Sequence, residues 1–157
     1  MEIILLTIGK TTQPHIIDGI NEYLRRLKRL TSYRIECLPD VKKNKTITAE
    51  LQKEKEGELI LNYLNHSDMS VLLDEHGTEY SSIEFSSQLQ KMMSSGRKRI
   101  VFIIGGPYGF SKQVYQRADT KISLSKMTFT HEMVRLFFTE QIYRAFTILR
   151  GEPYHHE

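Results

Sequence analysis

The chain alternates short apolar runs with longer segments of helical periodicity, and this alternation limits it to few architectures. Ile3 to Ile8 is an almost continuous apolar run closed by Gly9, which is typical of a strand covered on both faces. Further strands are expected at 33–38, 71–73, 99–104 and 121–124. A strand–helix order repeated along one chain favours a mostly parallel sheet with helices on both faces. The predicted fold class is therefore α/β.

The length, composition and charge of the chain indicate the number of domains and the kind of partner it can bind. A chain of 157 residues has the length of one ordinary domain, so we treat 1–157 as a single domain. With 26% charged and 39% hydrophobic residues, the composition is that of a globular protein rather than a disordered one. The net charge of +3 permits a polyanionic partner such as RNA without requiring one.

Several expected helices carry start signals. Pro14 suits the first turn of a helix whose basic face runs from Arg25 to Arg29. A long charged helix is expected at about 48–65, after a basic loop at 39–46. Ser81 and Glu84 form a capping box, and Ser111 can cap a short helix after the fourth strand.

The last expected helix, at about 131–150, is apolar around most of its circumference. A helix that packs against a single core needs only one apolar stripe. The additional apolar residues, such as Leu136 and Phe137, therefore predict a second copy of the chain, and we expect a homodimer.

The cysteine content and the amino-terminal segment indicate the cellular compartment in which the protein is expected. Cys37 excludes an internal disulfide and a cysteine-rich zinc site, and its apolar surroundings in the sequence predict that it is buried. Residues 1–10 run directly into a strand without the features of a secretory leader. No window has the roughly 18 apolar residues of a membrane helix. We therefore expect a cytoplasmic protein with no membrane contact.

Three loops are candidates for a ligand site, because ligands of open α/β sheets bind beyond the carboxyl ends of the strands. They follow the strands that end at Leu73, at Ile104 and at Leu124. The second loop, 105–109, is rich in glycine but matches neither a dinucleotide fingerprint nor a phosphate-binding loop. The residues alone leave two interpretations open, a tight turn and a cofactor loop.

The carboxyl-terminal segment 150–157 contains Tyr154, His155 and His156. A tail of this kind is normally frayed. Its side chains are also suited to stacking on an unstacked base and to moving its proton, so an active-site role is the alternative. The sequence supplies no third ligand beside the two histidines, and we expect no metal site.

Five motifs make a family resemblance visible. They are Ile-Gly-Lys at 8–10, Ile-Gly-Gly-Pro-Tyr-Gly at 104–109, Leu-Ser-Lys-Met-Thr-Phe at 124–129, Glu-Gln-Ile-Tyr-Arg-Ala-Phe at 140–146 and Pro-Tyr-His-His at 153–156. With these motifs the whole chain resembles the bacterial ribosomal large-subunit RNA methyltransferase H family, of the SPOUT class. The resemblance implies a carboxyl-terminal trefoil knot and S-adenosylmethionine bound in the knotted loops at a dimer interface. It also implies N3-methylation of a pseudouridine in 23S ribosomal RNA of the assembled ribosome.

The resemblance also implies the site residues. The cofactor-binding residues it implies are Leu73, Gly105, Leu124, Ser125, Lys126, Met127, Thr128 and Phe129, which belong to the three loops chosen above. A proton must leave N3, and His155, Tyr154 and His131 are the candidates to accept it. Arg144, with Arg135 as a weaker candidate, is expected to stabilise the anionic base or its phosphate.

Simpler interpretations of these residues stay open. His131 can serve as the cap of its helix, and Arg144 can pair with Glu140 one turn earlier. In a dimer, the tail and the cofactor pocket of one active site can come from different subunits. Lys42, Lys43, Lys45 and the Arg25 to Arg29 face are candidate ribosome contacts, with plain solvation as the alternative. Without the ribosome, the tail and the basic loop are expected to be mobile.

Two rival functions share much of this reasoning. A related knotted methyltransferase that acts on transfer RNA would use the same cofactor loops with a different acceptor surface. A non-catalytic RNA-binding module associated with the ribosome would keep the fold without turnover. Binding of S-adenosylmethionine separates the last possibility from the first two, and the choice of acceptor separates those two from each other.

Overall fold

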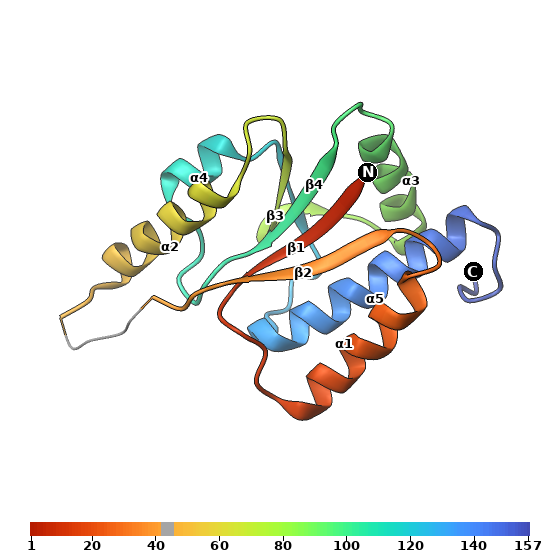
Figure 1. Ribbon diagram of the computed structural model, residues 1–157, viewed down its shortest axis with the longest axis horizontal. Helices are drawn as coiled ribbons and strands as arrows, with labels where there is room; N and C mark the ends of the chain where they lie inside the picture. The colour runs from red at the N-terminus through yellow and green to blue at the C-terminus, as the bar shows by residue number, and fades with distance from the viewer. Residues whose placement is uncertain (42–45) are drawn as a thin grey trace.

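The computed structural model describes residues 1–41 and 46–157, and its centre is a five-stranded sheet (Figure 1). All strand pairs in the sheet are parallel, in the order β2-β1-β4-β3-β5. The strands are β1 (Glu2–Ile8), β2 (Ser32–Leu38), β3 (Met69–Glu79), β4 (Arg99–Ile104) and β5 (Thr120–Ser123). The predicted α/β class with a mostly parallel sheet is confirmed. The trefoil knot stays a prediction.

Five helices cover the two faces of the sheet. They are α1 (Pro14–Leu27), α2 (Ala49–Tyr63), α3 (Ser82–Met93), α4 (Lys112–Arg117) and α5 (His131–Leu149). Helices α1, α3 and α5 lie on one face, and α2 and α4 lie on the other (Figure 1). The sheet thus separates two hydrophobic cores, as the sequence predicts for helices on both faces.

The central strands serve both cores at once. In β1, Ile3 and Leu5 belong to the core under α1, α3 and α5, while Ile4 and Leu6 belong to the core under α2 and α4. This division follows from the two-residue period of a strand, whose successive side chains point to opposite faces. It explains why the run at 3–8 is apolar throughout rather than alternating.

Three aromatic rings fix α5 and α3 against β4. Phe102 of β4 lies 4.7 Å from the ring of Phe138 on α5, and Phe85 on α3 contacts both rings edge-on at about 6 Å. Phe102 and Phe138 are fully buried. Because β4 ends at the glycine loop, this contact sets the position of α5 relative to that loop.

Most of the helices are preceded by a residue whose side chain caps their first turn. Ser81 and Glu84 form the predicted capping box, and the Ser111 hydroxyl accepts the Val114 N–H as predicted. Helix α5 is capped by Thr130, whose hydroxyl accepts the Met133 N–H. The alternative that His131 caps this helix is therefore wrong, because His131 occupies the first helical position and not the position before it.

Strand β3 is longer than predicted. Both Leu73 and Thr78 are paired with Ile122 of β5, so residues 74–77 bulge out of the strand while pairing resumes beyond them. The prediction that the strand ends near Asp74 is wrong, because the turn residues at 76–77 form a bulge rather than a chain reversal.

Cys37 is exposed, so the prediction of a buried thiol is wrong. It lies on β2, which is an edge strand of the sheet. An apolar run shows that a segment is a strand, but the order of the strands decides how much of it is covered. The β2 strand, with neighbours on one side only, keeps most of its residues partly exposed.

Helix α5 keeps an apolar surface outside the core. Its buried residues include Phe138, Ile142 and Ala145, whereas Phe137 stays 36% exposed and Leu136 is only partly covered. One core therefore does not bury all apolar residues of this helix. Across the described residues, no helix combines the length and the apolar character needed to cross a membrane.

Candidate functional site

A cavity of about 460 Å³ lies at the carboxyl ends of β3, β4 and β5, and we call it the strand-end cavity. This volume is within the range of small-molecule sites. Its lining includes every residue predicted to bind the cofactor except Lys126, whose side chain is exposed to solvent. Those lining residues are Leu73, Gly105, Leu124, Ser125, Met127, Thr128 and Phe129.

The glycine loop that borders this cavity is a tight turn. The Gly109 N–H donates to the Gly106 carbonyl at 3.2 Å. Gly109 has φ +82°, a left-handed conformation that favours glycine. A Cβ on Gly106 would lie 2.3 Å from a carboxylate oxygen of Glu56, so any other residue there would require this carboxylate to move. The loop is thus a turn and a wall of the cavity, and the two interpretations from sequence are compatible.

The loop after β5 is fixed by its own serines. The Ser123 hydroxyl donates to the Ser125 carbonyl at 2.9 Å, and the Ser125 hydroxyl accepts the Met127 N–H at 2.9 Å. These bonds hold the backbone, while the Met127 side chain is 76% exposed. Phe129 packs edge-on against Phe137 of α5 at 5.1 Å. A fixed backbone beside exposed apolar side chains suits the recognition of a flat aromatic ligand.

Two further side chains of the strand-end cavity form a pair. The Tyr115 hydroxyl, on α4, donates to Asp74, whose other carboxylate oxygen accepts the His76 N–H at 2.7 Å. Burial, followed by the Asp74 carboxylate, raises the pKa of Tyr115, so the phenol keeps its proton. The sequence marks Asp74 by its place near a strand end, but no pattern points to Tyr115. His131 also lines this cavity.

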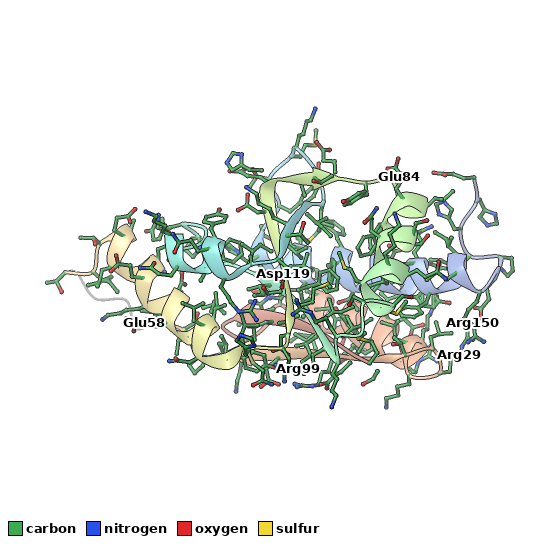
Figure 2. The ribbon with its side chains drawn as sticks, turned by 90° about the horizontal axis from the view of Figure 1, so that it is seen from above. Arg29, Glu58, Glu84, Arg99, Asp119 and Arg150 are labelled. Carbon is green, nitrogen blue, oxygen red and sulfur yellow. The ribbon has the colours of Figure 1, made fainter. Side chains whose placement is uncertain are left out.

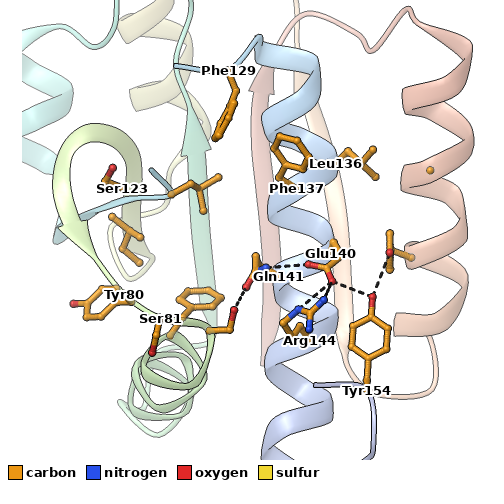
Figure 3. Close-up of a pocket in the computed structure, with 16 residues that line it drawn as sticks. Tyr80, Ser81, Ser123, Phe129, Leu136, Phe137, Glu140, Gln141, Arg144 and Tyr154 are labelled. Carbon is orange, nitrogen blue, oxygen red and sulfur yellow. Dashed lines mark hydrogen bonds and ion pairs between the residues drawn. The ribbon is translucent and has the colours of Figure 1, made fainter. Parts of the chain in front are cut away.

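A second cavity, the helix groove, lies between α1, α3 and α5 (Figure 3). It measures about 730 Å³ and is lined by apolar side chains that include Phe85, Leu136 and Phe137. Ser123, Leu124 and Phe129 line both cavities. At its other end the groove reaches the residues predicted for catalysis.

Three of those residues, Arg144, Tyr154 and His155, are gathered around Glu140, which the sequence predicts only as a partner for Arg144. Glu140 Oε1 accepts from Arg144 Nη2 at 2.5 Å, from Arg144 Nε at 3.1 Å and from the Tyr154 hydroxyl at 2.9 Å (Figure 3). Arg144 Nη1 lies 3.1 Å from His155 Nδ1. An arginine only donates, so Nδ1 is the acceptor in this contact. The pairing of Arg144 with Glu140 is therefore confirmed.

The tail is packed against its own chain, so the expectation of a frayed and mobile tail is wrong. The Tyr154 ring packs edge-on against Tyr143 at 4.7 Å, and its hydroxyl lies 3.3 Å from that of Tyr23. Burial, followed by the hydrogen bonds with Tyr23 and Glu140, raises the pKa of Tyr154. The phenol of Tyr154 therefore acts as a hydrogen-bond donor and not as a base in this arrangement.

Glu152 adds a second attachment of the tail. Its carboxylate pairs with Arg29 at 3.1 Å and with Arg150 at 3.0 Å. Both arginines lie at the same end of the molecule (Figure 2).

The four predicted catalytic residues fall into two groups. His131 lines the strand-end cavity, whereas Arg144, Tyr154 and His155 lie together near the other end of α5. His131 and Arg144 are thirteen residues apart on one helix, which is about 20 Å. A single chain therefore does not bring both groups to one point.

Among the described basic residues considered for ribosome contact, the three arginines of the α1 face are paired within the chain. Arg25 and Arg26 both pair with Glu22, at 2.7 Å and 2.9 Å. Lys42, Lys43 and Lys45 lie outside the described residues. Arg135 is 3% exposed and donates to the Ile8 carbonyl at 3.0 Å, so it supports the end of β1 and lines neither cavity.

The parallel α/β sheet has a cavity of small-molecule size at the carboxyl ends of its strands, and comparison with known proteins gives the class to which the chain belongs. A family model described as a predicted SPOUT methyltransferase matches residues 1–155. Within the described residues, 1–41 and 46–157, no group of histidine, cysteine, aspartate and glutamate side chains has the arrangement of a metal site. The match over residues 1–155 places the chain in the SPOUT methyltransferase family.

Relatives that match over the full chain show which family of SPOUT methyltransferases the chain belongs to. A protein of Bacteroides thetaiotaomicron is 54% identical over all of both chains, and one of Christiangramia forsetii is 57% identical over 99% of both. A protein of Porphyromonas gingivalis is 54% identical over all of both chains. Each is named ribosomal RNA large subunit methyltransferase H. The chain belongs to this methyltransferase family, as the sequence motifs predict.

Proposed function

We propose that this chain transfers the methyl group of S-adenosylmethionine to N3 of a pseudouridine in 23S ribosomal RNA. We further propose that it acts in the cytoplasm, on the assembled ribosome, and as a homodimer. Methyl transfer to ribosomal RNA follows from family membership. The single observation that supports S-adenosylmethionine as the methyl donor is the strand-end cavity, where a glycine loop and an apolar loop meet.

The residues of the strand-end cavity fit S-adenosylmethionine. Leu73, Leu124 and Met127 offer apolar surfaces to the faces of an adenine ring. The backbone of the glycine loop and of the loop after β5 offers N–H and C=O groups to its edge. When bound, this donor supplies an electrophilic methyl group on its sulfonium. We assign the eight predicted residues to donor binding, with Lys126 acting through its backbone.

Attack on a sulfonium methyl requires the base nitrogen to approach in line. Positioning and exclusion of water can therefore provide most of the acceleration. The packed loops of the strand-end cavity provide such positioning, because Ser123 and Ser125 hold one of them and α5 lies against Phe129. The proposed reaction requires no metal.

The N3 atom must also lose its proton. We assign His155 as the acceptor of this proton: Nδ1, which carries the free electron pair of the neutral ring, exchanges its contact with Arg144 Nη1 for the N3 proton when the base binds. His131 is the alternative, because it lines the strand-end cavity. Arg144 stabilises the anionic base. Tyr154 keeps its own proton, because burial and its hydrogen bonds raise its pKa, and it holds Glu140 and thereby Arg144 in place.

Each active site is then shared between two chains. Tyr154 and His155 are held near the far end of α5 from the strand-end cavity. A homodimer in which the tail of one protomer reaches the strand-end cavity of its partner brings the two groups together. The helix groove, with Phe137 36% exposed and Phe129 37% exposed, is the surface that a partner would cover.

The test is transfer of labelled methyl from S-adenosylmethionine to ribosomes that lack the modification, with free ribosomal RNA and bulk transfer RNA as parallel acceptors. The proposal predicts label in 23S RNA that maps to a pseudouridine and appears only with ribosomes. Label in transfer RNA alone would contradict the ribosomal substrate. Binding of S-adenosylmethionine without transfer to any acceptor would contradict the enzymatic proposal and favour a binding role.

A further inference from the structure

We infer that Glu56 of α2 is a positioning residue for the glycine loop, and that it sets the affinity of the strand-end cavity for S-adenosylmethionine. Glu56 does not line that cavity. It contacts the loop from the opposite side and so acts through the backbone. The inference rests on the proposed function, because it concerns the donor site.

The burial of Glu56 is the first observation. Its side chain belongs to the buried face of α2, together with Gln52, Gly57 and Ile60, and only 3% of the residue is exposed. Glutamate is rarely buried to this degree, because removing a carboxylate from water is costly. Glu58, two residues further along the same helix, is exposed. A structural or functional contact must therefore offset the cost at position 56.

The second observation is what the Glu56 carboxylate touches. A Cβ built on Gly106 would lie 2.3 Å and 2.4 Å from its two oxygens, so the carboxylate lies directly against the Gly106 backbone. A Cβ on the next helix residue, Gly57, would lie 2.4 Å from Ser111 Oγ. Two consecutive residues of α2 thus support both ends of the segment from Gly106 to Ser111.

The chemistry of the loop explains why it needs this support. A glycine turn has few side chains of its own to pack, so its shape depends on neighbouring groups. The negative charge of Glu56 lies beside this backbone, and an amide of the same shape would fill the same space without that charge. Because ligand binding depends on the loop's position to within about 1 Å, a displaced loop weakens donor binding.

The first test measures the dissociation constant of S-adenosylmethionine by calorimetry on the full chain. Glu56→Ala is expected to raise the dissociation constant by about tenfold or more, and Glu56→Gln by a smaller factor. Glu58→Ala, an exposed change on the same helix (Figure 2), is the matched control and should bind as the wild type does. In steady-state assays the KM for S-adenosylmethionine should rise while the KM for ribosomes is unchanged, a split that simple loss of folded protein does not produce.

The second test is a double-mutant cycle between Glu56 and Gly106. Gly106→Ala places a methyl group against the carboxylate and should weaken donor binding when Glu56 is present. In a Glu56→Ala background the same change has space, so it should add little. This cycle can also be run with Glu56→Asp, whose shorter side chain withdraws the carboxylate from Gly106, if the alanine variant does not fold.

Three results would overturn the inference. They are wild-type affinity in the Glu56 variants, additive effects in the cycle, and a loss of affinity that matches the loss of folded protein. If the wild type itself does not bind S-adenosylmethionine, the proposed function fails together with the inference. If the wild type binds and the Glu56 variants bind equally well, only the inference fails.

Discussion

Glu140 links the residues assigned to catalysis. One of its carboxylate oxygens accepts hydrogen bonds from Arg144 and Tyr154, and the other accepts from Gln141 at 3.0 Å. Arg144 also contacts His155 and lies over the Tyr154 ring, 4.7 Å from its centroid. The guanidinium is therefore held in one orientation before substrate binds, and the Glu140 carboxylate raises its pKa so that it stays charged. Such preorganisation favours stabilisation of a developing anion.

Tyr154→Phe tests this arrangement at one atom. The variant loses the hydroxyl that donates to Glu140, so turnover with ribosomes should fall by about tenfold while S-adenosylmethionine binds with unchanged affinity. The free energy of unfolding should fall by only about 1 kcal/mol, the value of one hydrogen bond. Tyr80→Phe, in the same groove, is the control. Unchanged turnover in Tyr154→Phe would show that the hydroxyl has no role in positioning.

At the scale of elements, the amino-terminal end of α1 is capped by a carboxylate that belongs to α5. Helix α1 has no side-chain cap of its own at Gln13. Glu132 Oε1 accepts the Thr12 N–H at 2.8 Å and the Gln13 N–H at 2.9 Å. The negative charge also interacts favourably with the amino-terminal end of a helix. Glu132 thus joins the two helices that border the helix groove.

The contact of Glu132 with the start of α1 predicts that the stability of the protein depends on pH. The backbone and side-chain hydrogen bonds from Gln13 and Thr12 lower the pKa of Glu132 below its unfolded value of 4.5. Its contribution to stability is therefore fully present above about pH 4.5 and lost as pH falls through the lower folded-state value. Thermal unfolding should show Glu132→Gln less stable than the wild type at pH 7, with the difference shrinking as pH falls toward 3. A difference that is independent of pH would contradict this assignment.

The elements themselves follow closely from the sequence, and the departures have local causes. The strand at 99–104 and the capping box of Ser81 and Glu84 were predictable because they depend on neighbouring residues alone. The extension of β3 beyond Asp74 depends on pairing with β5, which is distant in sequence. The exposure of Cys37 depends on strand order. Hydrophobic periodicity carries no information about either.

The candidate site was predictable only in part, because some of its contacts join segments that are distant in sequence. The loops at Leu73, 105–109 and 124–129 were found because strand ends identify them, and they do line one cavity. The support of the glycine loop by Glu56 and the packing of Tyr154 onto Tyr143 join distant segments. No spacing rule within one element reveals such contacts.

At the scale of the whole molecule, the helix groove is the surface that a second copy would fill. Its apolar lining includes the exposed Phe129 and Phe137, whose rings lie 5.1 Å apart, and contiguous exposed apolar surface is typical of an interface. The predicted homodimer would cover this surface and would also bring a tail to each strand-end cavity.

Phe137→Glu tests the interface. A charge in the groove should convert the dimer into a monomer in sedimentation experiments and abolish methyl transfer, because each site would lose the partner's tail. Leu51→Glu is a matched control, since Leu51 is 41% exposed on α2, on the opposite face of the sheet. A Phe137→Glu protein that stays dimeric, or a wild type that is already monomeric, would contradict the proposed interface.

The most direct test of methyl transfer at a shared site is complementation between two impaired variants. Gly105→Val places a side chain against the buried Phe110 ring, 3.0 Å from the new Cβ, and so distorts the wall of the strand-end cavity. Arg144→Ala removes the cation near the tail. Each should be inactive alone. Equal co-expression should form mixed dimers in which one site combines the intact cavity of one chain with the intact Arg144 and tail of its partner. A mixture of Gly105→Val and Leu124→Glu, both in the cavity, is the control without an intact combination.

The measured quantity is labelled methyl transferred to 23S RNA of unmodified ribosomes. A shared site predicts recovery of about one quarter of the wild-type activity in the first mixture, because half of the dimers are mixed and each has one intact site. The control mixture should stay inactive. Absence of recovery in the first mixture, with mixed dimers shown to be present, would contradict the shared site and place all catalytic residues within one chain.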